Sequence, residues 1–310
     1  MKAGAGLSPV DLMLLGTVLL WALNITVTRY VLVHGFSPLA YAVIRYGAAI
    51  GLFAVFTYRR ERSFRIARRD WPLVALAALA IFSNQLGFVY GIKLTSASNM
   101  ALILGTTPIF IGIIAVALGL ESLKRSFWLT ALLSFAGVAL VAAASGGPSA
   151  YLLGDLLALA TALTWSVFSV SIAPLMRRYS PYRISSVVLA LGWLPLAVAG
   201  APQLSNQGFH FNHLTWIGFA YAVVGPLFLT NILWFTAISR VGASRASLFA
   251  NLQPFFAVLF AFILLSEHLK TLELAGGALI FASVILERRA HRRAEARAAS
   301  LEEELIAANP

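Results

Sequence analysis

Residues 11–21 read DLMLLGTVLLW, and residues 155–165 read DLLALATALTW. In each stretch an aspartate is followed by an apolar run and, ten positions on, by a tryptophan, with Thr17 and Thr161 at matching places. Such a run has no charged face to turn toward water, so it predicts a helix whose solvent is lipid. Its recurrence 144 residues later indicates that this helix occurs twice in the chain.

A second pair of segments repeats in the same order. Residues 97–108 and 243–254 both begin with alanine and end with proline, and they lie 146 positions apart. At that same offset Glu121 and Glu267 are each followed by x-Leu-Lys. Chance gives one such match, but several matches in order predict an internal duplication.

The composition is that of a polytopic membrane protein. Of 310 residues 60% are hydrophobic and 11% are charged, and the mean hydropathy is +0.84. A soluble domain of this length needs a more charged surface, whereas a membrane span needs roughly 20 apolar residues. Apolar runs predict ten spans: Pro9–Val33, Pro38–Tyr58, Trp71–Lys93, Ala97–Leu118, Phe127–Ala144, Tyr151–Met176, Pro181–Gly200, Leu214–Ser239, Ala243–Leu265 and Leu269–Glu287.

The basic residues predict the orientation of these spans. With the amino terminus in the cytoplasm, the inner side receives all but four of the 23 Lys and Arg. The exceptions are Arg29, Arg45, Lys93 and Lys270. The positive-inside rule therefore predicts a multi-pass protein of the cell (inner) membrane with both termini cytoplasmic. The net charge of +11 is then an orientation signal and a contact for anionic lipid heads, not a nucleic-acid footprint.

Five spans per half is an odd number, so the second copy must lie inverted in the membrane. The loop between spans 2 and 3 holds six arginines and its counterpart between spans 7 and 8 holds none, as inversion requires. The predicted fold is all-α, with ten transmembrane helices in two inverted five-helix repeats around a central cavity. The first repeat covers residues 1–146, the second 147–290, and a cytosolic tail 291–310. Inverted repeats are a recurring plan of secondary transporters.

The tryptophan of the first span, Arg45-Tyr46 in the second and the repeated Ala-x10-Pro…Glu pattern resemble the EamA domain of the drug/metabolite transporter superfamily. Two copies would cover about residues 9–288. The resemblance implies ten helices with helices 1, 3, 4, 6, 8 and 9 around the cavity, and export of small metabolites. Within the family the chain is most similar to YddG-type exporters of aromatic and other neutral amino acids. It departs from the family at Trp21-Ala22, where Trp-Gly is common, and the second copy lacks a match to Arg45.

Helical spacing identifies candidate lining residues, since side chains three and four apart share a face. Polar groups within a membrane should face protein or water, so these stripes should point inward. Interhelical packing is the alternative role, favoured for the Ser and Thr residues, while lining is favoured for the mid-span amides. The predicted substrate-binding residues are Trp21, Asn24, Gln85, Phe88, Trp165, Phe168, Asn231, Trp234 and Asn251.

Three further residues have two possible roles each. Pro108 and Pro254 lie mid-span at symmetric positions, where each is either a hinge that gates the cavity or a static kink. Arg45 lies about 10 Å below the outer end of its helix, by a rise of ~1.5 Å per residue. It could anchor a substrate carboxylate, or it could snorkel outward or bond helix-end carbonyls; the peripheral place of helix 2 in the family favours the structural role.

Absent motifs exclude several functions. With no cysteine, the chain has no disulfide, thiol nucleophile or Cys-ligated metal. It contains no Gly-Lys and hence no Walker A loop, and its histidines fall in loops, span ends or the tail. We therefore expect no enzyme, metal or cofactor. Together with the inverted repeats, the resemblance implies a secondary transporter that exports small metabolites, most simply neutral and aromatic amino acids, and we expect facilitative alternating access. Its expected partners are that substrate and membrane lipids, and a monomer suffices. The alternatives are a passive channel, a lipid-handling membrane protein, or a carrier of another metabolite.

Overall fold

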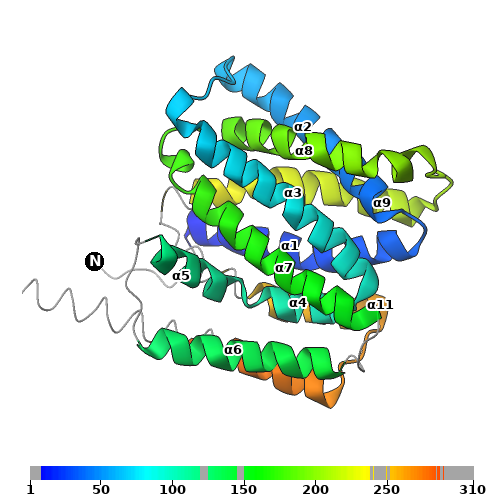
Figure 1. Cartoon of the computed structure of the whole chain (residues 1–310). Helices are drawn as coiled ribbons and strands as arrows, with labels where there is room; N and C mark the ends of the chain where they lie inside the picture. Colours follow the sequence, from blue (N-terminus) through cyan, green and yellow to red (C-terminus); the bar gives the residue numbers. More distant parts are fainter. Residues whose placement is uncertain are drawn as a thin grey trace, which may run out of the picture.

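The computed structural model describes residues 8–118, 125–144, 150–237 and 252–283, with residues 240, 249, 285, 286 and 289. Every regular element within these residues is helical (Figure 1). The long helices are α1 (Pro9–Val33), α2 (Pro38–Glu61), α3 (Trp71–Leu94), α6 (Arg125–Ala144), α7 (Ala150–Ile172) and α8 (Pro181–Ser205). The shorter ones are α4 (Ala97–Leu104), α5 (Thr107–Ala117), α9 (His213–Val223), α11 (Gln253–Leu265) and the helix Thr271–Ser283. A π-helix, Val224–Leu229, continues α9, and residues 230–237 return to α-helix.

Ser-Pro dipeptides start three of the long helices. Ser8, Ser37 and Ser180 are extended N-cap residues, and each is followed by a proline in the first turn. Proline suits this position because it lacks only an N–H that the helix leaves unbonded, and its φ is already helical. The Ser8 side chain also accepts from the Asp11 amide, and the Asp11 carboxylate accepts from the Ser8 amide. Local sequence therefore fixes where these helices begin.

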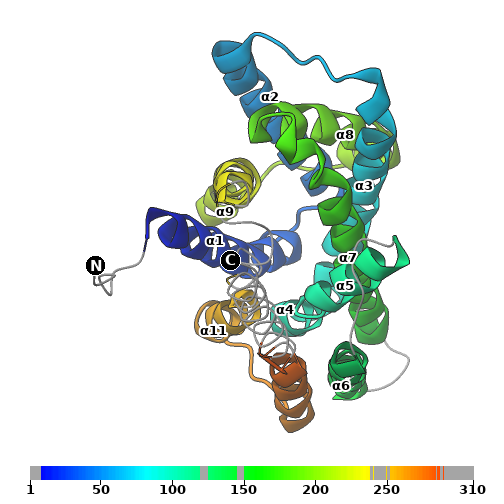
Figure 2. The same ribbon diagram turned by 90° about the vertical axis from the view of Figure 1, so that its left-hand side faces the viewer.

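Helices from the two halves of the chain pack against one another in pairs. Helix α3 lies along α7, α2 along α8, and α1 along α11 (Figures 1 and 2). Glycines allow the close approach of α3 and α7: a Cβ on Gly154 would lie 2.7 Å from the Thr95 backbone nitrogen, and one on Gly87 2.7 Å from Thr161 Oγ1. Small residues at helix interfaces are characteristic of membrane proteins, where close van der Waals packing replaces the hydrophobic effect.

The outside of the bundle is apolar. Val198 is 77% exposed, Leu129 69% and Leu132 68%. A water-soluble monomer rarely leaves such residues open in number, so lipid is the solvent that fits. Seven described helical segments are long and apolar enough to cross a membrane, when α4 with α5 and α9 with its continuation to Ala237 are each counted as one. Three shorter apolar helices, Trp128–Gly137 within α6, Gln253–Leu265 and Thr271–Ser283, lie in the regions of the predicted fifth, ninth and tenth spans.

The predicted fourth span, Ala97–Leu118, is not one bent helix as expected. Helix α4 ends at Leu104, and α5 begins at Thr107 with Pro108 in its first turn. Proline removes the N–H that would bond the Leu104 carbonyl; the Thr107 hydroxyl donates to that carbonyl instead, at 2.7 Å. The carbonyl that the proline leaves without its helical N–H donor is therefore still hydrogen-bonded. The start of the predicted ninth span, Ala243 to Asn251, lies outside the described residues apart from Phe249, and α11 begins with Pro254 in its first turn.

Candidate functional site

Four of the predicted aromatic residues meet in the middle of the bundle. The Trp21 ring of α1 lies 5.8 Å from the Trp165 ring of α7 and 5.0 Å from the Trp234 ring, measured between centroids. Trp165 lies 5.2 Å from Phe168 one turn further along α7. The three tryptophans are half-buried and Phe168 is buried. We call Trp21, Trp165, Phe168 and Trp234 the central aromatic cluster; spans 1, 6 and 8 contribute to it.

The π-helix sets the orientation of Trp21. Its indole Nε1 donates to Thr230 Oγ1 at 2.8 Å and to the Pro226 carbonyl at 3.3 Å. The Thr230 hydroxyl donates to the same Pro226 carbonyl. Single π turns inside helices are often found at functional sites, since the wider turn exposes backbone carbonyls that an α-helix would use. A mid-span Gly-Pro at residues 225–226 is the sequence signal for this feature.

A chain of polar side chains runs beside the aromatic cluster. On α1 the Thr28 hydroxyl donates to Asn24 Oδ1 at 3.3 Å and shares a 3.1 Å hydrogen bond with Tyr41 OH of α2. Arg45, one turn along α2, donates from Nη1 to Tyr41 OH at 3.4 Å. The next hydrogen bond, from Arg45, extends this chain of contacts to a third helix, α3.

That link is the hydrogen bond from Arg45 Nη2 to Gln85 Oε1, at 2.6 Å. Gln85 Nε2 donates to Asn84 Oδ1, and Asn84 Nδ2 donates to the Thr161 carbonyl of α7 at 2.9 Å. Hydrogen bonds thus connect one set of residues across α1, α2, α3 and α7. We call this set the polar network; it consists of Asn24, Thr28, Tyr41, Arg45, Gln85, Asn84 and Thr161. Each end lies one helical turn from the aromatic cluster, Asn24 beside Trp21 on α1 and Thr161 beside Trp165 on α7.

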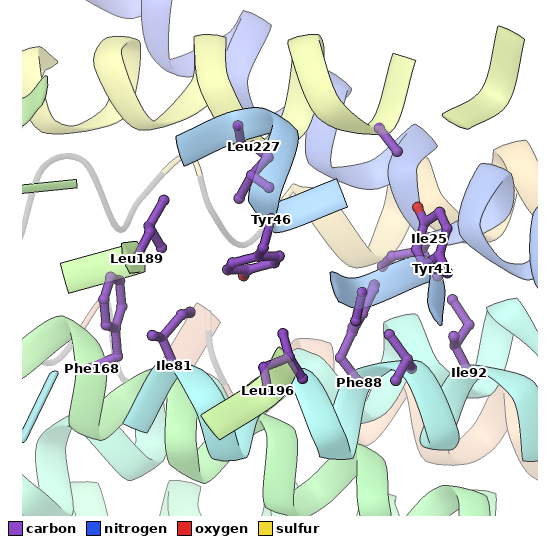
Figure 3. Packing of buried hydrophobic residues seen from close by; sticks show 14 of the residues in the cluster. Ile25, Tyr41, Tyr46, Ile81, Phe88, Ile92, Phe168, Leu189, Leu196 and Leu227 are labelled. Carbon is purple, nitrogen blue, oxygen red and sulfur yellow. The ribbon is translucent and has the colours of Figure 1, made fainter. Parts of the chain in front are cut away.

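Aromatic rings surround the arginine. Its guanidinium carbon lies 5.0 Å from the Tyr41 ring centroid, 5.4 Å from that of Tyr46 and 5.7 Å from that of Phe88. Figure 3 shows Tyr41, Tyr46 and Phe88 in the packed interior. Arg45 itself is 4% exposed, so it does not snorkel outward, and it bonds side chains rather than helix-end carbonyls. The outward and helix-end placements are therefore wrong, because the side chain points across the bundle to α3; whether Arg45 has a structural or a binding role stays a prediction.

The other predicted site residues fall in several places. Asn231 is buried, and its amide donates to the Leu227 carbonyl, at the end of the π-helix. Asn251 lies outside the described residues. Pro108 and Pro254 both occupy the first turn of a helix, and a Cβ on Gly105 would lie 3.2 Å from Pro254 Cγ, so the two breaks lie close together. A hinge at these prolines stays a prediction.

One end of the bundle is closed by contacts between the halves. The Glu267 carboxylate accepts from the amides of Ala97 and Ser98 at 3.0 Å and from the Ser98 hydroxyl at 2.8 Å, so it caps α4 from across the bundle. Gln207, in the loop before α9, accepts from the Ser37 amide. Phe211 of the same loop stacks on Phe36, with their ring centroids 4.5 Å apart. This is the end to which the charge pattern assigns the outer side.

The opposite end carries the basic residues and two ion pairs. Arg178 pairs with Asp70, and Arg183 with Glu61, each joining the two halves of the chain. Among the described residues, His, Asp and Glu form no group of three that could hold a metal ion. In the part of the chain that the structure describes, the residues in the middle of the bundle offer recognition by rings, amides and the Arg45 guanidinium.

Comparison with known proteins decides the family. The model of the EamA-like transporter family matches residues 8–143 and matches again at residues 152–287. The chain belongs to this family. It is a transporter and not an enzyme, and with its apolar helices it is an integral membrane protein.

Relatives in bacteria and archaea are likewise named as transporters or exporters. The chain is 24% identical to the uncharacterized transporter YyaM of Bacillus subtilis (strain 168), over 89% of this chain and 92% of the relative. It is 26% identical to an uncharacterized transporter of Archaeoglobus fulgidus, over 87% and 95%. It is 28% identical to a probable terminal-alkyne amino-acid exporter of Streptantibioticus cattleyicolor, over 84% and 85%. A solved crystal structure, 18% identical, matches with a TM-score of 0.63 over 91% of this chain and 97% of that chain, which shows a shared fold alone.

Proposed function

We propose that this transporter exports neutral amino acids, preferring aromatic or large apolar side chains, by facilitative alternating access around a central site. The observation that carries the proposal is the central aromatic cluster lying one turn from the polar network. Rings reward burial of a flat apolar group by about 25 cal/mol per Å², and stacking adds about 0.5–1.5 kcal/mol. The network offers hydrogen bonds to a polar head.

Three features support this assignment beyond the residues themselves. The resemblance to YddG-type exporters implies neutral and aromatic amino acids. The Streptantibioticus relative is named as an amino-acid exporter. The predicted inverted repeats, five spans each with the site between them, are the architecture in which alternating access recurs.

Counterflow in proteoliposomes tests the substrate class. We expect wild-type protein to exchange Phe, Trp and Met faster than Thr, and to exchange Lys and Glu least. Trp234→Ala should lower apparent affinity for Phe and Trp about 3–10-fold while Thr changes little, because it removes one ring of the cluster. Trp216→Ala is the matched control, since Trp216 packs in the separate outer group with Phe211 and Phe219.

The same assay separates a carrier from a channel. A carrier shows saturable flux and accelerated exchange when substrate is present on both sides, whereas a channel shows neither. Strong preference for Lys or Glu, or affinity for Phe that is indifferent to Trp234, would overturn the proposed substrate class. Linear, unsaturable flux would instead favour the passive channel.

A further inference from the structure

We propose that Arg45 is the carboxylate anchor of the transported substrate, and that Gln85 Oε1 lies where one oxygen of that carboxylate would bind. This inference rests on the proposed function, a small organic substrate bound in the middle of the bundle, and adds the group that recognises its acid end. Arg45 lies in the polar network with one side chain, Gln85, held against it at 2.6 Å.

A buried guanidinium calls for an anion. It stays charged, and burying a charge is unfavourable unless the charge is paired and hydrogen-bonded. Six acidic side chains lie in the described residues, and each is engaged elsewhere. Their partners are Ser8 for Asp11, Arg183 for Glu61, Arg178 for Asp70, Thr95 for Asp155, the α4 amides for Glu267 and the Lys270 amide for Glu273. Within the described part of the chain, Arg45 therefore makes no ion pair.

The donors left over have the geometry of a carboxylate site. Arg45 Nη1 reaches Tyr41 and Nη2 reaches Gln85, while Nε is buried without a hydrogen-bond partner. Nε and Nη2 form one edge of the planar fork, and two parallel N–H donors on such an edge match the two oxygens of a carboxylate. A substrate carboxylate would displace Gln85 Oε1 from Nη2 and satisfy Nε as well.

Arg29 shows how this chain satisfies an arginine whose role is structural. Its Nη1 donates to the carbonyls of Ile92 and Lys93 at the end of α3, so it completes a helix terminus. Arg45 has no such backbone carbonyl partner: Tyr41 accepts from it through the hydroxyl, and Tyr46 and Phe88 supply ring faces. The contrast between the two arginines argues for a ligand at Arg45.

The arrangement also orients the substrate. Gln85 Oε1, once released, can accept from the substrate ammonium, with Asn24 Oδ1 also in the network. The side chain would then extend toward Trp21 and Trp165, which lie one helical turn from Asn24 and Thr161 of the network. Acid, amine and ring of an aromatic amino acid each meet a matching group.

The test compares phenylalanine with phenylalaninol, in which a hydroxymethyl group replaces the carboxylate. We expect purified wild-type protein to bind phenylalanine at least about 30-fold more tightly than phenylalaninol, because the buried arginine has no anion to pair with in the phenylalaninol complex. Gln85→Glu places an internal carboxylate beside Nη2, so it should remain folded and lose this preference. Gln203→Glu is the matched control: its oxygen would still accept from the Leu39 amide, away from Arg45, and the preference should persist.

Equal binding of phenylalanine and phenylalaninol by wild type would overturn the anchor, as would a folded Gln85→Glu protein that keeps the preference. Failure of the proposed function is detected separately. If wild type exchanges no amino acid, thermal stabilisation by phenylacetate and by phenylacetamide decides. Stabilisation by the acid alone, lost in Gln85→Glu, supports a carboxylate anchor for another substrate; no stabilisation by the acid overturns it.

Discussion

Glu267 is a single residue that joins the two halves at the predicted outer end. Its carboxylate takes three donors from the first turn of α4, where the helix dipole also favours negative charge. Charge-assisted hydrogen bonds of this kind contribute about 1.5–3 kcal/mol each at most, and together they hold α4 against the loop after α11. This one side chain therefore stabilises closure of that end.

Glu267→Gln should loosen the α4 end. Glutamine keeps one acceptor oxygen but turns an NH2 group toward the Ser98 donors. Hydrogen exchange of the amides at residues 97–100 should become about 10–100-fold faster, which corresponds to about 1.4–2.7 kcal/mol. Glu273→Gln is the control, because Glu273 caps the Lys270 amide of its own helix. Unchanged exchange in α4 would show that the cap does not hold this end.

Single residues also show where sequence reasoning stops. Helical spacing predicted that Trp21, Trp165 and Trp234 face one interior, and they do pack together. The pairing of Arg45 with Gln85 depends on how α2 rotates against α3, which no spacing within one helix records. Tyr41, Asn84 and Thr230 joined the site for the same reason, through contacts between helices.

At the scale of the helix, starts were predictable and interruptions were not. Apolar runs predicted α1 as Pro9–Val33, which the structure confirms. Pro108 was predicted to bend a continuous span, but the helix ends and restarts there because Thr107 can bond the free Leu104 carbonyl. The π-helix at Val224–Leu229 arises from packing around Gly225 and Pro226, and periodicity does not signal it.

The α3–α7 contact makes a prediction about helix packing. Gly154→Ala would place a Cβ 2.7 Å from the Thr95 nitrogen and 2.8 Å from the Leu94 carbonyl carbon, both backbone atoms that cannot turn away. Overpacking of this kind costs about 1–3 kcal/mol, so the melting temperature in detergent should fall by several degrees. Gly51→Ala has no atom within 4 Å of its Cβ and should be neutral or stabilising. Equal melting temperatures for the two variants would contradict this contact.

The whole molecule has two chemically distinct ends. The loops around Arg65 and Arg178 are basic, whereas the loop around His210 is not. Because the chain has no cysteine, one can be added at each end. His210→Cys should react with an impermeant thiol reagent added to intact cells, and Arg65→Cys should react only after the membrane is opened; both positions are exposed. The reverse pattern would show that the charge-based orientation is wrong.

Energy coupling is also a property of the whole molecule. Within the described residues every acid and every histidine lies at or near a helix end, while Arg45 is buried within the bundle. Proton-coupled carriers usually need a titratable group near the midplane. A zwitterion bound at Arg45 also moves no net charge.

We therefore expect transport down the substrate's own gradient, without obligatory proton exchange. In sealed proteoliposomes holding a pH-sensitive dye, a phenylalanine pulse should leave the internal pH unchanged, and an imposed membrane potential should not alter the rate of counterflow. An added protonophore provides the control that the vesicles hold a gradient. A substrate pulse that reliably moves protons would instead place a titratable group on the path, and the candidates are then the acids at the helix ends, with Asp155 on α7 the first to replace, because its helix carries Trp165.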